Sequence, residues 1–361
     1  MTNTRPCTAL LASLALLATL GTGCATQLQM PSVSREDLRV EQEKQRELAL
    51  ATRWQREKRL MKVSSRILVA GAELCGKYVQ PHYGLHVGSV ADFTSEFRSA
   101  AESLFGRDER VRVWYVAPDS AADDAWLMEG DVVLAINGKR IKRTKDALRA
   151  LAKSQYVRME IERKGSTRTL GIRPKTACGY RIQVIEQDMV NAFADGKNVI
   201  LAQGMLRFAS TDEELALVVG HEVAHNALGH LKRTTANQMI GILLGGAVDV
   251  LAAAGGINTG GDAMRLGGNI GGRAFSQGFE KEADYMGVYL AARAGYGVSN
   301  APMFWRRMAI EHPGSIKENY MSSHPSSPER SIRLEQAVKE IARKRARGAA
   351  LVPARKNSSP E

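Results

Sequence analysis

The fold is decided by the stretch Thr211-Asp212-Glu213-Glu214-Leu215-Ala216-Leu217-Val218-Val219-Gly220-His221-Glu222-Val223-Ala224-His225. A threonine with a glutamate three residues later is the capping-box pattern, which predicts a helix from Thr211 through Leu231. Residues four apart lie on one helix face, about 6 Å apart along the axis, so His221 and His225 can bind one metal ion. Glu222 lies beside such an ion and can act as general base on a water that the metal activates. The alternative is a pair of ordinary helix histidines, because this pattern also occurs by chance.

A catalytic zinc ion requires a third protein ligand and an open position for water. His230 follows His225 by five residues, whereas the extended metzincin pattern needs glycine three and histidine six residues on, and leucines stand there. His312 precedes a proline, which is a poor context for a ligand. Neither histidine is therefore favoured.

The favoured third ligand is Glu280, in the run Glu280-Lys281-Glu282-Ala283-Asp284. Glu280 and Asp284 share one helix face, whereas Glu282 is expected to point away. Glu280 would bind the ion, and Asp284, one turn along, would orient a ligand histidine through its free N–H. A solvated acidic run is the alternative for this segment.

The middle of the chain changes to short alternating runs separated by turns. Residues 111–116 and 157–163 are strand-like, and residues 144–153 predict a helix. With these elements, one motif resembles a bacterial PDZ domain: Gly130-Asp131-Val132-Val133-Leu134-Ala135-Ile136-Asn137-Gly138-Lys139. The resemblance implies that extended peptides bind by strand addition, often through a C-terminal carboxylate, and Phe105-Gly106 is the candidate carboxylate loop. A small β-rich domain that only positions its neighbour is the alternative.

Several further motifs surround the histidine pair: Asn191-Ala192-Phe193-Ala194-Asp195-Gly196, Gly204-Met205-Leu206, Glu214-Leu215-Ala216, and Glu280 with Asp284. Over residues 180–335 this combination resembles the gluzincin zinc metalloproteases of peptidase family forty-eight, the HtpX-like, Oma-like, BepA-like and CAAX-prenyl-protease enzymes. The resemblance implies an α+β fold, with a mainly helical zincin domain and a small edge sheet. It also implies a zinc metalloendopeptidase that holds one zinc ion per chain.

The same resemblance extends to Ser323-His324-Pro325 and to Arg330, which match the family's "HP…R" element. It implies that His324 approaches zinc as a reversible plug or steadies the transition-state oxyanion, and that Arg330 fixes the loop. A plain structural role is the alternative for both residues. The family also implies that a strand near Asn191 or Val199 pairs with the substrate backbone. BepA-like members carry helical repeats after the protease domain, whereas here a PDZ-like segment precedes it, so Oma-like bacterial lipoproteins are the nearer comparison.

The first residues have the pattern of a secretory signal. Arg5 provides a positive start, residues 9–20 form an apolar run too short to span a bilayer, and small residues lead to Cys24. This arrangement resembles a lipobox with glycine where leucine is preferred, and it predicts that Cys24 is lipidated. The following alanine implies sorting to the outer membrane. Ordinary secretion with a free Cys24, giving a soluble periplasmic or secreted protein, is the alternative.

Two cysteines remain in the body of the chain, and an oxidising compartment favours their pairing. A Cys75–Cys178 disulfide would close a loop of about a hundred residues and add about 4 kcal/mol in the chain-entropy model. Two buried free thiols are the alternative.

The chain is basic, with 50 Lys and Arg against 38 Asp and Glu and a net charge of +12 over 361 residues. Much of the excess lies in charged helices, including one predicted over residues 34–70, and in the C-terminal tail. No basic stripe alternates with aromatic residues and no nucleic-acid motif occurs, so we expect no nucleic acid as partner. Attraction to an acidic membrane surface is compatible with this charge.

We expect five parts: a lipoprotein-type signal peptide (1–23), a tether and charged helix (24–80), a PDZ-like domain (81–177), a zinc metalloprotease domain (178–340) and a basic flexible tail (341–361). The expected function is a zinc endopeptidase on the periplasmic side of the bacterial outer membrane. It would remove misfolded or mislocalised envelope proteins, and the PDZ-like domain would select exposed C-terminal tails. The alternative is a PDZ-bearing adaptor or chaperone with an idle or structural zinc site. A glutamate beside the first histidine favours the enzyme, because a closed structural site would not need it.

Overall fold

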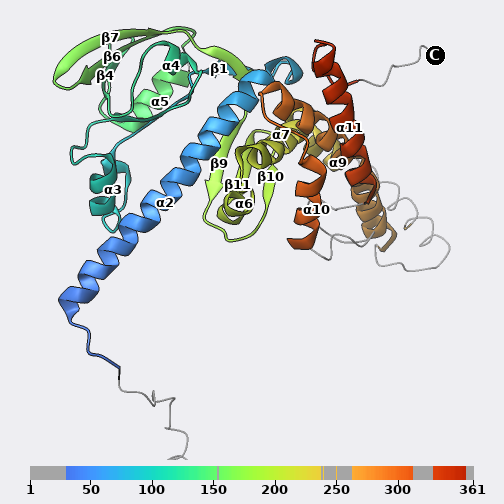
Figure 1. The fold of residues 1–361 in the computed structure, drawn as a ribbon, viewed down its shortest axis with the longest axis horizontal. Helices are drawn as coiled ribbons and strands as arrows, with labels where there is room; N and C mark the ends of the chain where they lie inside the picture. Colours follow the sequence, from blue (N-terminus) through green and yellow to red (C-terminus); the bar gives the residue numbers. More distant parts are fainter. Residues whose placement is uncertain are drawn as a thin grey trace, which may run out of the picture. The chain divides into compact units, whose positions relative to one another are not determined.

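The computed structural model describes residues 30–152, 154–236, 239, 249, 262–311 and 328–354. The chain divides into two compact units, residues 1–46 and residues 47–361. In the first unit, helix α2 (Arg35–Ala70) begins after Ser34, whose Oγ accepts a hydrogen bond from the amide of Asp37. Helix α2 continues into the second unit, which contains every other described element (Figure 1). The long helix predicted over residues 34–70 is thereby confirmed.

Helices and a small sheet form the part of the second unit that we call the helical body. Its helices are α6 (Gln203–Phe208), α7 (Asp212–Ala227), α9 (Asp262–Arg293), α10 (Ala301–Glu311) and α11 (Pro328–Ala346). In its sheet, β11 (Asn198–Ala202) pairs antiparallel with β10 (Ala192–Ala194) and parallel with β9 (Arg181–Ile185). Strand β10 is therefore an edge strand of this sheet among the residues that the structure describes.

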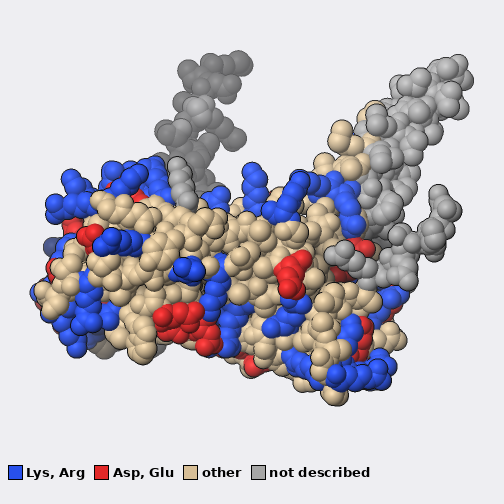
Figure 2. Space-filling view, turned by 90° about the horizontal axis from the view of Figure 1, so that it is seen from above, with Lys and Arg blue, Asp and Glu red and all other residues tan. Residues whose placement is uncertain are grey.

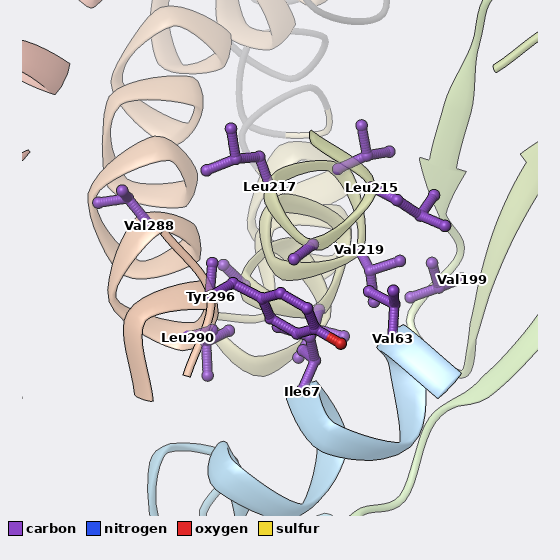
Figure 3. Close-up of a cluster of buried hydrophobic side chains, with 14 of the residues drawn as sticks. Val63, Ile67, Val199, Leu215, Leu217, Val219, Val288, Leu290 and Tyr296 are labelled. Atoms are coloured by element: carbon purple, nitrogen blue, oxygen red, sulfur yellow. The ribbon is translucent and has the colours of Figure 1, made fainter. Parts of the chain in front are cut away.

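The second half of helix α2 contributes to the core of the helical body. Val63 and Ile67 are fully buried and pack in one cluster with side chains from β11, α7 and α9 (Figure 3). Their partners in this cluster include Val199, Leu215, Val219, Val288 and Leu290. Burying one such side chain contributes about 1.5–3 kcal/mol. The segment expected to be only a tether and charged helix is therefore, in its last turns, part of the body that carries the histidine pair.

A second, β-rich part lies between residues 79 and 178, and we call it the inserted domain. Its sheet has the order β2-β3-β4-β6-β7, all antiparallel. The strands are β2 (Leu85–Gly88), β3 (Arg112–Val116), β4 (Val132–Ile136), β6 (Val157–Arg163) and β7 (Ser166–Ile172), and β5 (Lys139–Arg140) pairs with β4. Three α-helices accompany them among the described residues, α3 (Arg98–Phe105), α4 (Ala121–Asp124) and α5 (Thr144–Ala152), together with one 3-10 turn (Val90–Asp92). Mixed helix and sheet, as predicted for the chain, is confirmed.

The inserted domain leaves and rejoins the body through one two-stranded neck. Strand β1 (Val79–His82) pairs antiparallel with β8 (Lys175–Cys178), so that Val79 faces Cys178. Cys75 and Cys178 form a disulfide across a sequence separation of 103, and both sulfur-bearing side chains are buried in the core of the body. The β-rich segment is thus inserted between helix α2 and the rest of the body, rather than following a separate tether.

Three local details differ from the sequence-based expectations. Helix α7 ends at Ala227 instead of Leu231, because Leu228 and Gly229 form a turn in which Gly229 has φ +66°. Thr211 is the N-cap as predicted, and its side chain accepts a hydrogen bond from the amide of Glu214. The Glu214 carboxylate, however, accepts from the amide of Ser210 rather than from that of Thr211. The tail expected from residue 341 is helical through Ala346, as the end of α11.

Charged side chains are distributed over the surface of the second unit. On the face seen in Figure 2, Lys and Arg side chains lie in several separate groups, with Asp and Glu between some of them. Within the described part of the chain, no helix combines the length and the apolar character needed to cross a bilayer.

Candidate metal centre

Three predicted ligands converge where helix α7 meets helix α9. His221 Nε2 lies 3.0 Å from His225 Nε2, and Glu280 places one carboxylate oxygen 3.3 Å from His221 Nε2 and the other 3.2 Å from His225 Nε2. Ligand atoms bound at about 2.1 Å to one tetrahedral ion lie about 3.4 Å apart. The three side chains therefore fit a single metal ion, and they are the group of potential metal ligands found among the described residues.

Two glycines allow the helices to come this close. A β-carbon on Gly220 would lie 2.6 Å from the carbonyl oxygen of Gly287, and one on Gly287 would lie 2.8 Å from the backbone nitrogen of His221. Both contacts are with backbone atoms, so neither could be relieved by a side-chain rotation. The glycine next to the first histidine thus sets the distance over which Glu280 can reach the two imidazoles.

The other ring nitrogen of His221 faces a buried ion pair. His221 Nδ1 lies 3.1 Å from Asp284 Oδ1, and Arg330 donates to Asp284 from Nε at 2.7 Å and from Nη2 at 2.8 Å. Burial alone would raise the pKa of Asp284, but the charge and hydrogen bonds of Arg330 prevail and lower it. Asp284 is therefore an anion that accepts from His221, which is the arrangement that orients a histidine for metal binding.

Electrostatics at the site favour a positive charge. Burial opposes protonation of His221, but its hydrogen bonds to Asp284 and Glu280 prevail and raise its pKa to about 10. For His225 burial prevails, and it lowers that pKa. The carboxylates thus stabilise one positive charge beside His221, which a bound metal cation would supply in place of the proton.

Glu222 and Arg330 complete the surroundings of the ligands. Glu222 follows His221 on α7 and is only 2% exposed, and Arg330 comes from α11 and is 5% exposed. Burial disfavours the charge of Arg330, but Asp284, Glu280 and Glu222 outweigh this and raise its pKa. One buried guanidinium therefore neutralises part of a site that contains three carboxylates.

Trp305 on helix α10 was not identified from the sequence. Its ring lies 4.9 Å from the ring of His221, and the guanidinium of Arg330 lies 5.0 Å from the centre of the same indole. The indole thus contacts both a ligand and the cation that holds Asp284. Only the position of a tryptophan in a short helix preceding the Arg330 segment could have drawn attention to it.

Glu282 points away from the three ligand atoms, as expected, and its side chain is 52% exposed, but it contacts His230. Its Oε2 lies 3.1 Å from His230 Nε2, and His230 Nδ1 lies 3.0 Å from His225 Nδ1. His230, which the spacing excluded as a ligand, therefore reaches the back of a ligand histidine.

Several predicted residues fall elsewhere. Cys24, His312 and His324 lie outside the described residues. Phe105 and Gly106 lie at the end of α3, where the Phe105 ring stacks on Trp114 at 4.1 Å.

Two protein families match overlapping parts of the chain. Residues 152–338 match Peptidase family M48, and residues 88–173 match the PDZ domain. The chain belongs to peptidase family M48. Membership of this metalloprotease family implies a bound metal, and the chain offers the His221–His225–Glu280 group for it.

Curated relatives resemble part of the chain. It is 30% identical over 168 residues to mitochondrial metalloendopeptidase OMA1 of Arabidopsis thaliana, covering 44% of this chain and 31% of that protein. It is 30% identical over 138 residues to the beta-barrel assembly-enhancing protease of Yersinia pestis, covering 36% of this chain and 28% of that protein. It is also 30% identical to mitochondrial metalloendopeptidase OMA1 of Schizosaccharomyces pombe, and this match covers 46% of this chain and 49% of that protein. The matches therefore span between 28% and 49% of the length of these relatives.

Proposed function

We propose that the protein is a zinc-dependent endopeptidase. The observation that carries this proposal is the convergence of His221, His225 and Glu280 on one point, with Glu222 as the next residue on the same helix. A zinc ion held there would polarise a peptide carbonyl and acidify a water molecule. The zincin architecture, with one zinc ion per chain, is part of this proposal.

The residues around the metal position have separate tasks in the proposed reaction. Glu222 takes the proton of the attacking water and passes it to the nitrogen of the leaving amine. Asp284 holds His221 in the orientation and tautomer that expose Nε2, and Arg330 keeps Asp284 ionised. Arg330 thus acts on the ligand set, in addition to the loop-fixing role expected for it. His324 is proposed to approach the site as a plug or as a donor to the oxyanion.

Strand β10 is proposed to bind the substrate backbone. It is one of the two edge strands of its sheet among the described strands, and it packs against helix α7, which carries the two histidines. An extended peptide can add to such an edge by main-chain hydrogen bonds, which recognise any sequence. Broad sequence tolerance suits the removal of misfolded or mislocalised envelope proteins, which is the substrate class we propose.

The inserted domain is proposed to select exposed C-terminal tails. Strand β2 is an edge strand of its sheet as described, and helix α5 packs against it, which are the two walls of a PDZ peptide groove. We place the carboxylate loop at Tyr83-Gly84, directly before β2, where Gly84 has φ +69°. Phe105-Gly106 is not suited to this role. Phe105 stacks on Trp114, and the Trp114 side chain points to the face of the sheet opposite to the one on which Val113 packs in the core of the inserted domain.

The cell envelope is the proposed location, with the chain anchored by a lipid on Cys24 to the periplasmic side of the outer membrane. The Cys75–Cys178 disulfide supports an oxidising compartment. Metabolic labelling with a fatty acid tests the anchor. The label should be lost in Cys24→Ala and kept in Cys7→Ala. Equal labelling of all three proteins would exclude an anchor at Cys24, and no label on any of them would leave a soluble periplasmic or secreted protein.

Hydrolysis of unfolded casein by the zinc-loaded chain tests the activity. Glu222→Gln should bind zinc as the wild type does, but lose about 10²- to 10⁴-fold in rate, because the proton acceptor is gone. Glu280→Ala should lose both zinc and activity. Equal rates for wild type and Glu222→Gln would reject the enzyme in favour of an adaptor or chaperone with an idle site. A pull-down with Glu222→Gln, which can bind substrates without cleaving them, would identify natural substrates.

A further inference from the structure

His230 and Glu282 form a chain of contacts behind the ligand His225. His225 Nδ1 faces His230 Nδ1 at 3.0 Å, and His230 Nε2 faces Glu282 Oε2 at 3.1 Å. Arg233 donates to the same Glu282 oxygen at 2.6 Å. The contacts run from the ligand through one buried imidazole to a carboxylate at the surface.

The direction of the hydrogen bonds follows from the metal site. If His225 binds a cation through Nε2, its remaining proton is on Nδ1, and His230 Nδ1 must accept it. A neutral His230 then carries its own proton on Nε2 and donates it to Glu282. Each ring nitrogen of His225 and His230 therefore has one role in these contacts, and the tautomers of both histidines are fixed.

We propose that His230 and Glu282 are positioning residues, which hold the ligand His225 in its metal-binding tautomer and orientation. The inference rests on the proposed function, because it assumes that His225 binds zinc. It assigns to His230 a task other than the ligand role that its spacing excluded.

The arrangement on His225 parallels the one on His221. Asp284 accepts from His221 and is held by Arg330, and Glu282 accepts from His230 and is held by Arg233. The two carboxylates differ in burial, since the Asp284 side chain is 3% exposed and that of Glu282 is 52% exposed. His221 thus contacts its carboxylate, Asp284, directly, whereas His225 reaches its carboxylate, Glu282, through His230.

The turn after helix α7 makes the contact possible. On an unbroken helix a residue five positions later points about 140° away from His225. The left-handed Gly229 breaks the helix first, and the His230 ring then stacks on Phe279 at 4.6 Å with 13° between the planes. Packing on Phe279 fixes the ring plane and could by itself explain a buried histidine, so the test must separate packing from hydrogen bonding.

A matched pair of variants makes that separation in the full chain. His230→Phe keeps an aromatic ring against Phe279 but offers no acceptor to His225, whereas His230→Gln offers an acceptor oxygen without the ring. Glu282→Gln keeps an acceptor for His230, and Glu282→Ala removes it. Arg233→Ala removes the ion pair with Glu282 and the contact of the guanidinium with the Phe279 ring, so it measures what Arg233 adds to the positioning.

Three quantities are measured: zinc affinity by competition with a chelator, the protonated ring nitrogen of His225 by NMR of ¹⁵N-histidine-labelled zinc-bound protein, and the melting temperature of the zinc-free protein. We expect His230→Phe to bind zinc about 10- to 100-fold more weakly and to lose the slowly exchanging Nδ1–H signal of His225. Its zinc-free melting temperature should stay close to that of the wild type. His230→Gln and Glu282→Gln should retain most of the affinity, and Glu282→Ala should lose part of it.

Two results would overturn the inference. One is a His230→Phe protein that binds zinc as tightly as the wild type and keeps the Nδ1–H signal. The other is an affinity loss that His230→Gln shares in full, which would show that an acceptor at this position does not hold His225. A wild-type chain that binds no zinc would instead overturn the proposed function, and the inference with it.

Discussion

Arg330 from helix α11 holds both carboxylate oxygens of Asp284 from helix α9, and the two side chains are buried together. A bidentate pair of this kind fixes the geometry of both partners. It also fastens the last described helix to the helix that supplies Glu280. Stability of the body and orientation of His221 therefore depend on the same two hydrogen bonds.

Removing the guanidinium should destabilise the protein strongly. Arg330→Ala leaves the buried charge of Asp284 without its partner, so we expect a loss of about 3–5 kcal/mol in the free energy of unfolding. Urea denaturation of the zinc-free protein measures it. Arg333→Ala, which removes an exposed ion pair with Glu329, is the control and should cost less than about 1 kcal/mol. Similar losses in both variants would contradict the structural role of the buried pair.

Adding one methyl group at the crossing of α7 and α9 should weaken zinc binding without altering a ligand. In Gly287→Ala the new carbon would meet the backbone of His221, so the helices must separate. We expect a stability loss of about 1–3 kcal/mol together with weaker zinc binding in a chelator competition. Gly278→Ala on the same helix meets nothing within 4 Å and should be neutral or slightly stabilising. Unchanged zinc affinity in Gly287→Ala would show that the helices need not be this close.

Loss of the disulfide should be measurable as stability of the whole unit. Replacing Cys75 and Cys178 by alanine opens a loop of 103 residues, which should cost about 4–5 kcal/mol in the chain-entropy model. Guanidinium denaturation with and without reductant checks this value. Reductant should lower the stability of the wild type and leave the double variant unchanged. A non-reducing mass map with both thiols free would refute the pairing.

Acid should destabilise the protein partly through His82. Burial lowers the pKa of this histidine to about 4, and its Nε2 lies 2.8 Å from Ser65 Oγ. The unfolded chain has a histidine pKa near 6.5, so it binds more protons than the folded chain between about pH 6.5 and pH 4. The contribution of His82 is therefore complete above pH 6.5 and is lost as the pH falls, with a slope of at most about 1.4 kcal/mol per pH unit.

Unfolding free energies at pH 7, 5.5 and 4.5 test this prediction. His82→Gln should give a flatter curve than the wild type over this range. Some slope should remain, because burial also lowers the pKa of His86. Superimposable curves for the two proteins would show that His82 is protonated in the folded state.

The grouping of His221, His225 and Glu280 was predictable because helix geometry turns spacing into position. His221 and His225 are four apart on α7, and Glu280 and Asp284 are four apart on α9, so each pair shares a face. Nothing in the spacing revealed how the two helices approach each other. That distance is set by Gly220 and Gly287, whose role depends on which backbone lies opposite them.

Residues that act behind the ligands were less accessible to sequence reasoning. Glu282 was rightly expected to point away from the ligands, but its contact with His230 was not foreseen, and His230 was judged only by a ligand pattern. The contact was missed because the turn at Gly229 redirects His230, whereas an unbroken helix had been assumed through Leu231. The elements of the inserted domain followed from alternation and turn residues, but its insertion behind helix α2 depends on the neck and on the burial of Val63 and Ile67.

The neck has a mechanical consequence. The backbone enters the inserted domain at Val79 and leaves it at Cys178, and these residues face each other while a covalent bond joins Cys75 to Cys178. Tension between helix α2 and the body would pass through the packed core and the disulfide, and the roughly one hundred residues between them would remain slack. Force applied to helix α2 would thus reach the body without unfolding the inserted domain.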